Sequence, residues 1–224
     1  MKILISDFDG TFLSKNFDEN IKFVQDFVRE GNIFIIATGR NITSLKKVIS
    51  TYDIPISYII YNDGGIILDS NNREIYRYDL DKSFCKKIFN ELEKSNIFEN
   101  VFYDNGYTYQ TKITKYNNRI IGKIKNRCEA KDFLDNLQKK YHDNIYAYLS
   151  NNWINITSGN NNKAKAIEFL VRINGWLKEE IYTVGNDIND LSMLMAYQGF
   201  LVGNNLDNCS VCSIVTFLEL KKVL

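Results

Sequence analysis

The chain has 224 residues, of which 45% are hydrophobic and 13% aromatic, and its 28 basic and 27 acidic side chains leave a formal charge of +1. This length suits one core domain with a smaller insertion, and the balanced charge gives no indication of a nucleic-acid or membrane-surface partner. No apolar run reaches the ~18 residues of a membrane span, and no signal-peptide pattern precedes Asp7. We therefore expect a cytoplasmic protein that is a monomer or a small homo-oligomer.

The first segment, K-I-L-I-S-D-F-D-G-T, changes abruptly from aliphatic residues to acids. A short apolar run that ends near a glycine predicts a buried strand, here residues 3–5, in a parallel sheet. Asp7 and Asp9 then lie at the carboxyl end of that strand, where ligands bind in open α/β sheets. Two acids this close repel each other unless a cation or a proton compensates them, although a solvated turn would also explain the pattern.

Strands and helices alternate over the next fifty residues. Apolar residues at helical spacing predict helices over residues 20–30 and 43–52, and apolar runs predict strands over 33–37 and 58–61. Both of these strands end in small or polar residues, T-G-R and N-D-G-G. This βαβ alternation indicates an α/β fold with a doubly wound, mainly parallel sheet.

The pattern changes between residues 66 and 157. Turn residues between two apolar runs predict a hairpin over residues 66–78, and two helix–strand–strand units follow it. Their predicted elements are helices at 81–95 and 130–141 and strands at 101–103, 107–113, 145–149 and 153–157. We expect this α-β-β-α-β-β block, residues 81–155, to form a separate α+β cap domain inserted into a discontinuous core of residues 1–80 and 156–224.

The alternation of strands and helices then resumes and completes the core. Helices are expected over residues 163–173 and 191–196, and strands over 181–184, 199–202 and 213–216, before a C-terminal helix. The strand at 181–184 ends in G-N-D-I-N-D, which places a second group of acids and amides at a strand end.

The strand ends and one helix start together display acids, a hydroxyl and a lysine, namely Asp7, Asp9, Thr38, Lys163 and the acids and amides of residues 186–190. Phosphoryl transfer needs neutralisation of charge and in-line positioning more than elaborate bond chemistry. Carboxylates can hold Mg²⁺, and an aspartate can be a nucleophile that forms an aspartyl-phosphate. The sequence therefore predicts a site for phosphoryl transfer.

Four segments resemble the motifs of the haloacid dehalogenase-like (HAD) hydrolases, and in particular those of the Cof-type phosphatases. They are D-F-D-G-T at 7–11, A-T-G-R at 37–40, N-K-A-K-A at 162–166 and G-N-D-I-N-D-L-S-M-L at 185–194. They stand in the order of the family, and the predicted cap lies between the second and the third. The resemblance implies a HAD-like fold and a Mg²⁺-dependent phosphatase that hydrolyses a small phosphorylated metabolite through an aspartyl-phosphate.

The resemblance also implies roles for individual residues. Asp7 would be the nucleophile, and Asp9 would be first the general acid and then the general base. Lys163 would pair with the phosphoryl group and with Asp7, although Lys165 is a rival for that role. The other residues expected to hold the phosphate or the substrate are Thr38, Gly10, Gly39, Arg40 and Asn189.

The resemblance implies four metal ligands, which are the Asp7 carboxylate, the Asp9 carbonyl, Asn186 and Asp190. The family usually has an aspartate at the position of Asn186. An amide oxygen can bind Mg²⁺ but carries no charge. We therefore expect a working metal site with weaker affinity than a fully acidic one.

Some residues allow more than one interpretation. Arg40 and Asp63 could brace loops as well as contact substrate, and Arg119 in the cap is expected on a solvated face. Cys209 and Cys212 form a C-x-x-C motif, but no second pair or histidine cluster accompanies it, so reduced thiols are expected rather than a zinc or redox site.

Two other functions remain open at this point. A phosphotransferase or phosphomutase would share the aspartyl-phosphate but pass the group to another acceptor. A phosphate-binding regulatory module without turnover would explain the uncharged Asn186, but it would not explain why the other predicted catalytic residues are present.

Overall fold

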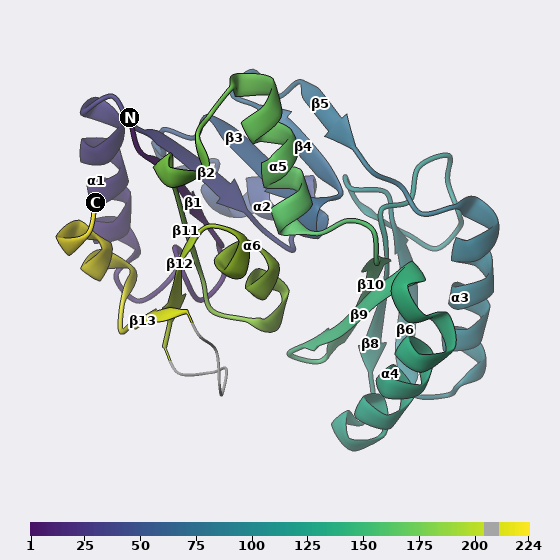
Figure 1. The fold of residues 1–224 in the computed structure, drawn as a ribbon. Helices are drawn as coiled ribbons and strands as arrows, with labels where there is room; N and C mark the ends of the chain where they lie inside the picture. The colour runs from purple at the N-terminus through teal and green to yellow at the C-terminus, as the bar shows by residue number, and fades with distance from the viewer. Residues whose placement is uncertain (204–210) are drawn as a thin grey trace.

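A computed structural model describes residues 1–203 and 211–224. Figure 1 shows an eight-stranded sheet with helices on both faces, beside a five-stranded sheet with helices on one face. The elements of the first part, the core, are β1 (Ile3–Ser6), α1 (Phe17–Arg29), β2 (Ile33–Ala37), α2 (Ile42–Ile49), β3 (Tyr58–Tyr61), β4 (Ile66–Asp69), β5 (Glu74–Arg77), α5 (Lys163–Asn174), β11 (Ile181–Gly185), α6 (Leu191–Ala196), β12 (Gln198–Val202) and β13 (Cys212–Ile214). The elements of the second part, the cap, are α3 (Lys82–Lys94), β6 (Phe98–Asp104), β7 (Tyr109–Gln110), β8 (Arg119–Ile124), α4 (Arg127–Tyr141), β9 (Ile145–Ser150) and β10 (Trp153–Ser158).

Strand β1 lies inside the core sheet, whose order is β13-β12-β11-β1-β2-β3-β4-β5. The strands from β13 to β3 are parallel, and β4 and β5 extend the sheet as an antiparallel edge. Ile3 of β1 is level with Ile181 of β11 and Ile33 of β2, so the carboxyl ends of these strands meet at one edge. This arrangement confirms the predicted fold class and places a ligand site at that edge.

The two faces of the core sheet follow from the two-residue period of a strand. On one face, Leu4 packs in a cluster with Phe34 and with residues of α1 and α2. On the other face, Ile3 and Ile5 pack in a cluster with residues of α5 and α6, the helices drawn in front of the core sheet in Figure 1. Both faces are covered, which explains why residues 3–5 of β1 are all apolar rather than alternating.

The cap sheet has the order β7-β6-β8-β10-β9, and its neighbouring strands are antiparallel. Its central strand, β8, was missing from the predicted α-β-β-α-β-β order. Ile120 and Ile124 of β8 pack towards α3 and α4, while Arg119 faces the other way and is 2% exposed. The expectation of a solvated Arg119 was therefore wrong, because alternation along a strand buries it against the core.

The last cap strand crosses the expected end of the cap. Strand β10 pairs with β9 as far as Ser158, three residues beyond residue 155. A division at 155 would cut the strand in two, so we propose that the cap ends at Ser158.

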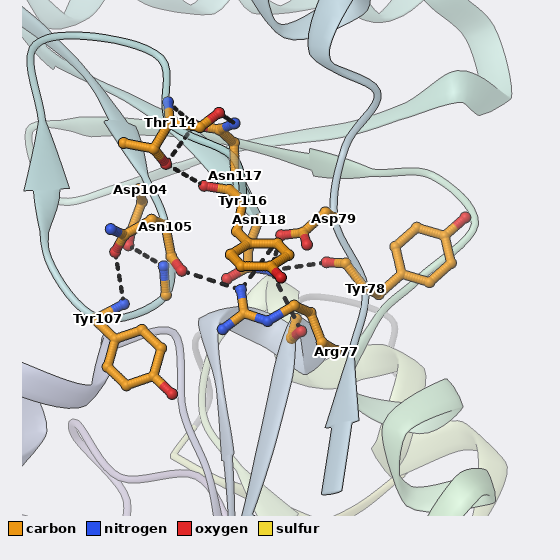
Figure 2. Close-up of polar contacts among 12 residues, drawn as sticks. Arg77, Tyr78, Asp79, Asp104, Asn105, Tyr107, Thr114, Tyr116, Asn117 and Asn118 are labelled. Carbon is orange, nitrogen blue, oxygen red and sulfur yellow. Dashed lines mark hydrogen bonds and ion pairs between the residues drawn. The ribbon is translucent and has the colours of Figure 1, made fainter. Parts of the chain in front are cut away.

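The cap is attached to the core by more than its two chain connections. Figure 2 shows the guanidinium of Arg77, at the end of β5, donating to the carbonyl of Asn105 at 3.2 Å and lying 4.8 Å from the ring centre of Tyr116. Asn118 donates to the carbonyl of Tyr78, in the linker, at 2.9 Å. The loop between β6 and β8 is therefore bound to the strand that leaves the core.

The tip of the same loop approaches the core closely at Gly106. Its carbonyl accepts a hydrogen bond from the first amide of α2, Ile42 N, at 2.9 Å. Gly106 has φ +89°, and a Cβ there would lie 2.0 Å from the Ile66 side chain. Gly106 thus provides both the backbone conformation and the space that this contact needs.

We predict that Gly106→Ala lowers the free energy of unfolding more than Gly175→Ala does. Gly175 also has positive φ, +68°, but nothing lies within 4 Å of its added Cβ. Both substitutions carry the left-handed penalty of about 1–2 kcal/mol, and only Gly106→Ala adds about 1–3 kcal/mol of overpacking. Urea unfolding of both variants measures the difference, and equal losses would contradict the close contact.

Candidate active site

The first acidic motif forms a tight loop after β1. The Asp7 amide donates to Val184 O of β11 at 2.8 Å and continues the parallel ladder. Phe8 is fully buried in the core cluster, which fixes the loop between the two acids. Asp7 is 6% exposed, whereas the Asp9 side chain is 49% exposed. The two carboxylates thus lie in different environments although only one residue separates them.

Lys163 joins the two strand ends on either side of it. It is the first residue of α5 and is completely buried, and its Nζ lies 2.7 Å from Asp7 Oδ1 and 2.6 Å from Asp190 Oδ1. Lys165, its rival, is on the surface and pairs with Glu168 at 3.4 Å. The structure thus brings together Asp7, Asp190 and Lys163, which are up to 183 residues apart in the chain.

The charges of this cluster do not balance. Burial and the neighbouring Asp190 raise the pKa of Asp7 to about 8, against the opposing effect of Lys163. Burial lowers the pKa of Lys163, but Asp190 and Asp7 raise it more, so the lysine stays charged. With both carboxylates ionised, the two carboxylates and one ammonium would leave one formal negative charge in a buried place. A proton on Asp7, which its raised pKa favours, or a bound cation would compensate that charge.

Asp9 is held by Arg40. The guanidinium donates to both carboxylate oxygens at 2.7 Å and lies over the Phe8 ring, with 5.5 Å between its carbon and the ring centre. Such a bidentate pair fixes the orientation of both groups. Arg40 therefore contacts the proposed acid–base residue directly, and it also lines the cavity at the site.

The loop after β2 presents hydrogen-bonding groups near the same cavity. Thr38 Oγ1 accepts from the Arg40 amide at 3.1 Å, which leaves its hydroxyl proton for another acceptor. No protein acceptor for the Gly39 amide is found in the described part of the chain. Gly39 lines the cavity, while Thr38 is 1% exposed and lies behind it. The Gly10 amide is already used, because it donates to Leu13 O at 3.1 Å.

Three oxygen positions converge beside Asp7, where the resemblance implied a metal. The inward atom of the Asn186 amide lies 2.9 Å from the Asp9 carbonyl oxygen, 3.3 Å from Asp7 Oδ2 and 2.9 Å from Thr11 Oγ1. Oxygen ligands in adjacent octahedral positions around Mg²⁺, each ~2.1 Å from the ion, lie about 3 Å apart. With the amide oxygen inward, Asp7, Asp9 and Asn186 therefore fit a Mg²⁺ ion.

Asp190, the fourth expected ligand, has both oxygens in use. Oδ1 accepts from Lys163, and Oδ2 accepts from the amides of Asn186 and Asp187 at 2.8 and 3.0 Å. Asp190 therefore shapes the loop and holds the lysine. Within the described ranges, no three acidic, histidine or cysteine side chains gather as metal ligands, because Asp9 faces Arg40 and Asp190 faces Lys163.

Asp63, which the sequence left open as a loop brace or a substrate contact, connects several parts of the site. It is 3% exposed, and its carboxylate accepts from Asn189 Nδ2 at 2.8 Å and from the Tyr148 hydroxyl at 2.5 Å. The Asn189 side chain thus donates to Asp63, beside the cavity that it lines. Burial and Asp63 raise the pKa of Tyr148, so the phenol stays a donor. Asp63 therefore links three elements: the end of β3, the last motif and the cap.

Arg119 links the cap to the loop after β2. Its guanidinium donates to Gly39 O at 2.6 Å and to Asp104 Oδ2 at 2.8 Å, and it lies 3.6 Å from Asp63. The only sequence signal for this role was the alternation of R-I-I-G-K-I, in which every second residue faces away from the cap helices. Arg119 thus holds the loop that carries Thr38 and Gly39.

The core and cap groups enclose one cavity of about 350 Å³. On the core side it is lined by Asp7, Asp9, Gly39, Arg40, Asn186, Asp187 and Asn189, and on the cap side by Tyr109, Arg119, Ile121, Tyr148, Ser150, Asn151, Trp153 and Asn155. Pockets for small ligands have volumes of this order. The nucleophile expected from the sequence therefore opens into a cavity of small-molecule size that the cap completes.

The family comparison agrees with the motifs and the geometry. A family model described as haloacid dehalogenase-like hydrolase matches residues 4–128 and 112–211. The chain belongs to the haloacid dehalogenase-like hydrolases. A solved structure described as a HAD/COF-like hydrolase from Plasmodium vivax has the same fold, with a TM-score of 0.85 at 20% identity, over 100% of this chain and 95% of that one.

Other proteins are similar to this chain in fold or in sequence. A HAD-like hydrolase structure from Bacillus subtilis has a TM-score of 0.81 at 19% identity, over 98% of this chain and 96% of that one. A Bacillus subtilis protein named 5-amino-6-(5-phospho-D-ribitylamino)uracil phosphatase YwtE is 26% identical, over 86% of this chain and 84% of its own length. The chain is thus a HAD-type hydrolase whose curated relatives include a named phosphatase.

We predict that Lys163→Met lowers the free energy of unfolding by about 3–5 kcal/mol, because it leaves two buried carboxylates without their cation. The matched control is Lys165→Met, which removes an exposed lysine two residues away and should change stability by less than about 0.5 kcal/mol. Chemical denaturation without added metal makes the comparison. Similar losses for both variants would contradict the buried role of Lys163.

Proposed function

We propose that the protein is a Mg²⁺-dependent phosphatase that hydrolyses a small phosphomonoester through a phosphorylated Asp7. The observation that carries this proposal is the arrangement around Asp7. One carboxylate oxygen is paired with buried Lys163, and the other belongs to the oxygen cluster with Asp9 O and Asn186. Such an environment orients a carboxylate as a nucleophile and neutralises the charge that gathers around a phosphoryl group.

The reaction would proceed in two displacements. Asp7 attacks phosphorus, the bond from phosphorus to the leaving oxygen breaks, and that oxygen takes a proton from Asp9. Asp9 then removes a proton from a water molecule, which attacks phosphorus and releases inorganic phosphate from Asp7. Mg²⁺, when bound by Asp7, Asp9 O and Asn186, would neutralise charge on the phosphoryl oxygens.

The other residues position the phosphate and control the proton. The Gly39 amide and the Thr38 hydroxyl are free to donate to phosphoryl oxygens. Arg40 holds both oxygens of Asp9, so proton transfer by Asp9 requires that at least one of these hydrogen bonds be released. A substrate anion that binds Arg40 would provide that release.

The substrate is proposed only by class. A cavity of about 350 Å³ suits a small metabolite, and the rings of Tyr109 and Trp153 on its cap side are nearly parallel, at 18°. Phosphorylated compounds with a planar ring, including the ribitylaminouracil phosphate in the name of the Bacillus relative, therefore belong in a screen beside sugar phosphates and phosphoglycolate.

The location, oligomeric state and partners of the enzyme are part of the same proposal. We place the enzyme in the cytoplasm as a monomer or small homo-oligomer, with no nucleic-acid or membrane partner. The net charge of +1 supports the expected absence of a nucleic-acid or membrane-surface partner. Across residues 1–203 and 211–224, no helix is long and apolar enough to cross a membrane.

The test is a panel of phosphorylated metabolites assayed for released phosphate with Mg²⁺. We predict that Asp7→Asn lowers kcat by at least about 10³-fold, because the amide cannot attack phosphorus to form the aspartyl-phosphate. Asp132→Asn, the same change at an exposed site in α4, should leave kcat unchanged. Activity that survives in Asp7→Asn would rule out the nucleophile.

The same panel separates the alternatives. Transfer of the phosphoryl group to a second alcohol or sugar phosphate, with loss of the donor but no release of inorganic phosphate, would indicate a phosphotransferase or phosphomutase. Binding of phosphorylated ligands without turnover at any Mg²⁺ concentration would indicate a regulatory module.

A further inference from the structure

The side chain of Asn186 can satisfy its site in two ways. An amide has an oxygen and an NH₂ group of nearly the same shape, and exchanging them requires only a rotation within the side chain. With oxygen inward, the amide completes the cluster with Asp9 O and Asp7 Oδ2. With nitrogen inward, the NH₂ group has three acceptors within reach of its two protons, Asp9 O and Thr11 Oγ1 at 2.9 Å and Asp7 Oδ2 at 3.3 Å.

The two orientations suit two states of the site. An inward amide oxygen that lies 2.9 Å from Asp9 O and 3.3 Å from Asp7 Oδ2 is repelled by them unless a cation or a proton lies between the oxygens. Without a cation, the inward NH₂ group gives hydrogen bonds to the same two groups, Asp7 Oδ2 and Asp9 O, that would bind the metal. An aspartate at this position has no donor to offer and would add a second uncompensated carboxylate next to Asp7.

The backbone around Asn186 allows this exchange without moving. The amide nitrogens of Asn186 and Asp187 are held by Asp190 Oδ2, so the loop is fixed independently of the side chain. The side chain packs over Gly10, where a Cβ would lie 2.6 Å from Asn186 Nδ2. Gly10, with φ +81°, thus leaves space for the amide.

We propose that the Asn186 amide is a switch that replaces the metal ion: its NH₂ group faces Asp7 and Asp9 in the metal-free protein, and its oxygen faces them when a divalent cation binds. This inference rests on the Mg²⁺ site of the proposed function. Metal binding then has to break the hydrogen bonds of the inward NH₂ group. The metal-free protein keeps its fold, and its affinity for Mg²⁺ is lower than that of a site with aspartate.

The first experiment compares the wild type with Asn186→Asp and with a control, Asn71→Asp, which adds the same charge in the exposed turn between β4 and β5. Thermal unfolding is followed in EDTA and in Mg²⁺, and Mg²⁺ affinity is measured by calorimetry. We expect N186D to unfold at a lower temperature than the wild type in EDTA, to bind Mg²⁺ at least about tenfold more tightly, and to gain more in stability from Mg²⁺. Asn71→Asp should behave as the wild type does.

The second experiment needs no substitution in the protein that is measured. In ¹⁵N NMR spectra, the side-chain NH₂ signals of Asn186, assigned by their loss in Asn186→Asp, report its hydrogen bonds. In EDTA these protons should be protected from exchange, and titration with Mg²⁺ should remove the protection while other asparagine side chains are unchanged. Protection that is the same with and without bound Mg²⁺ would overturn the switch.

The outcomes separate this inference from the proposed function. If the wild type binds Mg²⁺ and hydrolyses a phosphomonoester, but N186D is as stable as the wild type in EDTA and binds Mg²⁺ no more tightly, then the switch is wrong and the phosphatase stands. If neither protein binds a divalent cation in calorimetry, then the metal site of the proposed function fails, and the switch fails with it.

Discussion

The buried ion cluster of Lys163 with Asp7 and Asp190 is the interaction on which the site depends. The lysine is fully buried at the start of α5, and its two partners follow the adjacent strands β1 and β11. A charge buried in this way is tolerated only when its partners are well placed. The cluster therefore fixes the relative positions of three chain segments and, with them, the direction of the Asp7 carboxylate.

The remaining parts of the site extend from this cluster. Asp190 uses its second oxygen to hold the loop of Asn186, which brings the amide to the free oxygen of Asp7. On the opposite side, Asp63 and Arg119 connect the loop that carries Thr38 and Gly39 to the cap. The divalent cation that we propose would compensate the negative charge of an ionised Asp7 and bind the converging oxygens.

The sequence predicted the elements whose apolar pattern can be recognised within the segment itself. The strands β2 and β3 and the helix α6 have the bounds expected from their apolar patterns, and Lys163 lies beside Asp7 as the resemblance implied.

Strand β8 was missed because its buried Arg119 looks like a surface residue until Asp104 and Gly39, distant in sequence, come next to it. A sequence also does not show that lysine and two backbone amides donate to both oxygens of Asp190, so its approach to the metal, directly or through water, stays a prediction. Cys209 lies outside the described residues, and Cys212 is exposed, so the C-x-x-C expectation stays a prediction.

We propose that Asp7 carries the phosphoryl group during turnover. The most direct measurement is rapid acid quenching of Asp9→Asn during reaction with an aryl phosphate, whose leaving group needs no proton from Asp9, so that mainly the second displacement is slowed. Peptide mapping by mass spectrometry then locates any phosphoryl group. We predict a phosphorylated peptide that contains residues 7–11, with the modification on Asp7. Full turnover with no phosphorylated peptide at any quench time, together with inversion of configuration at phosphorus, would contradict it.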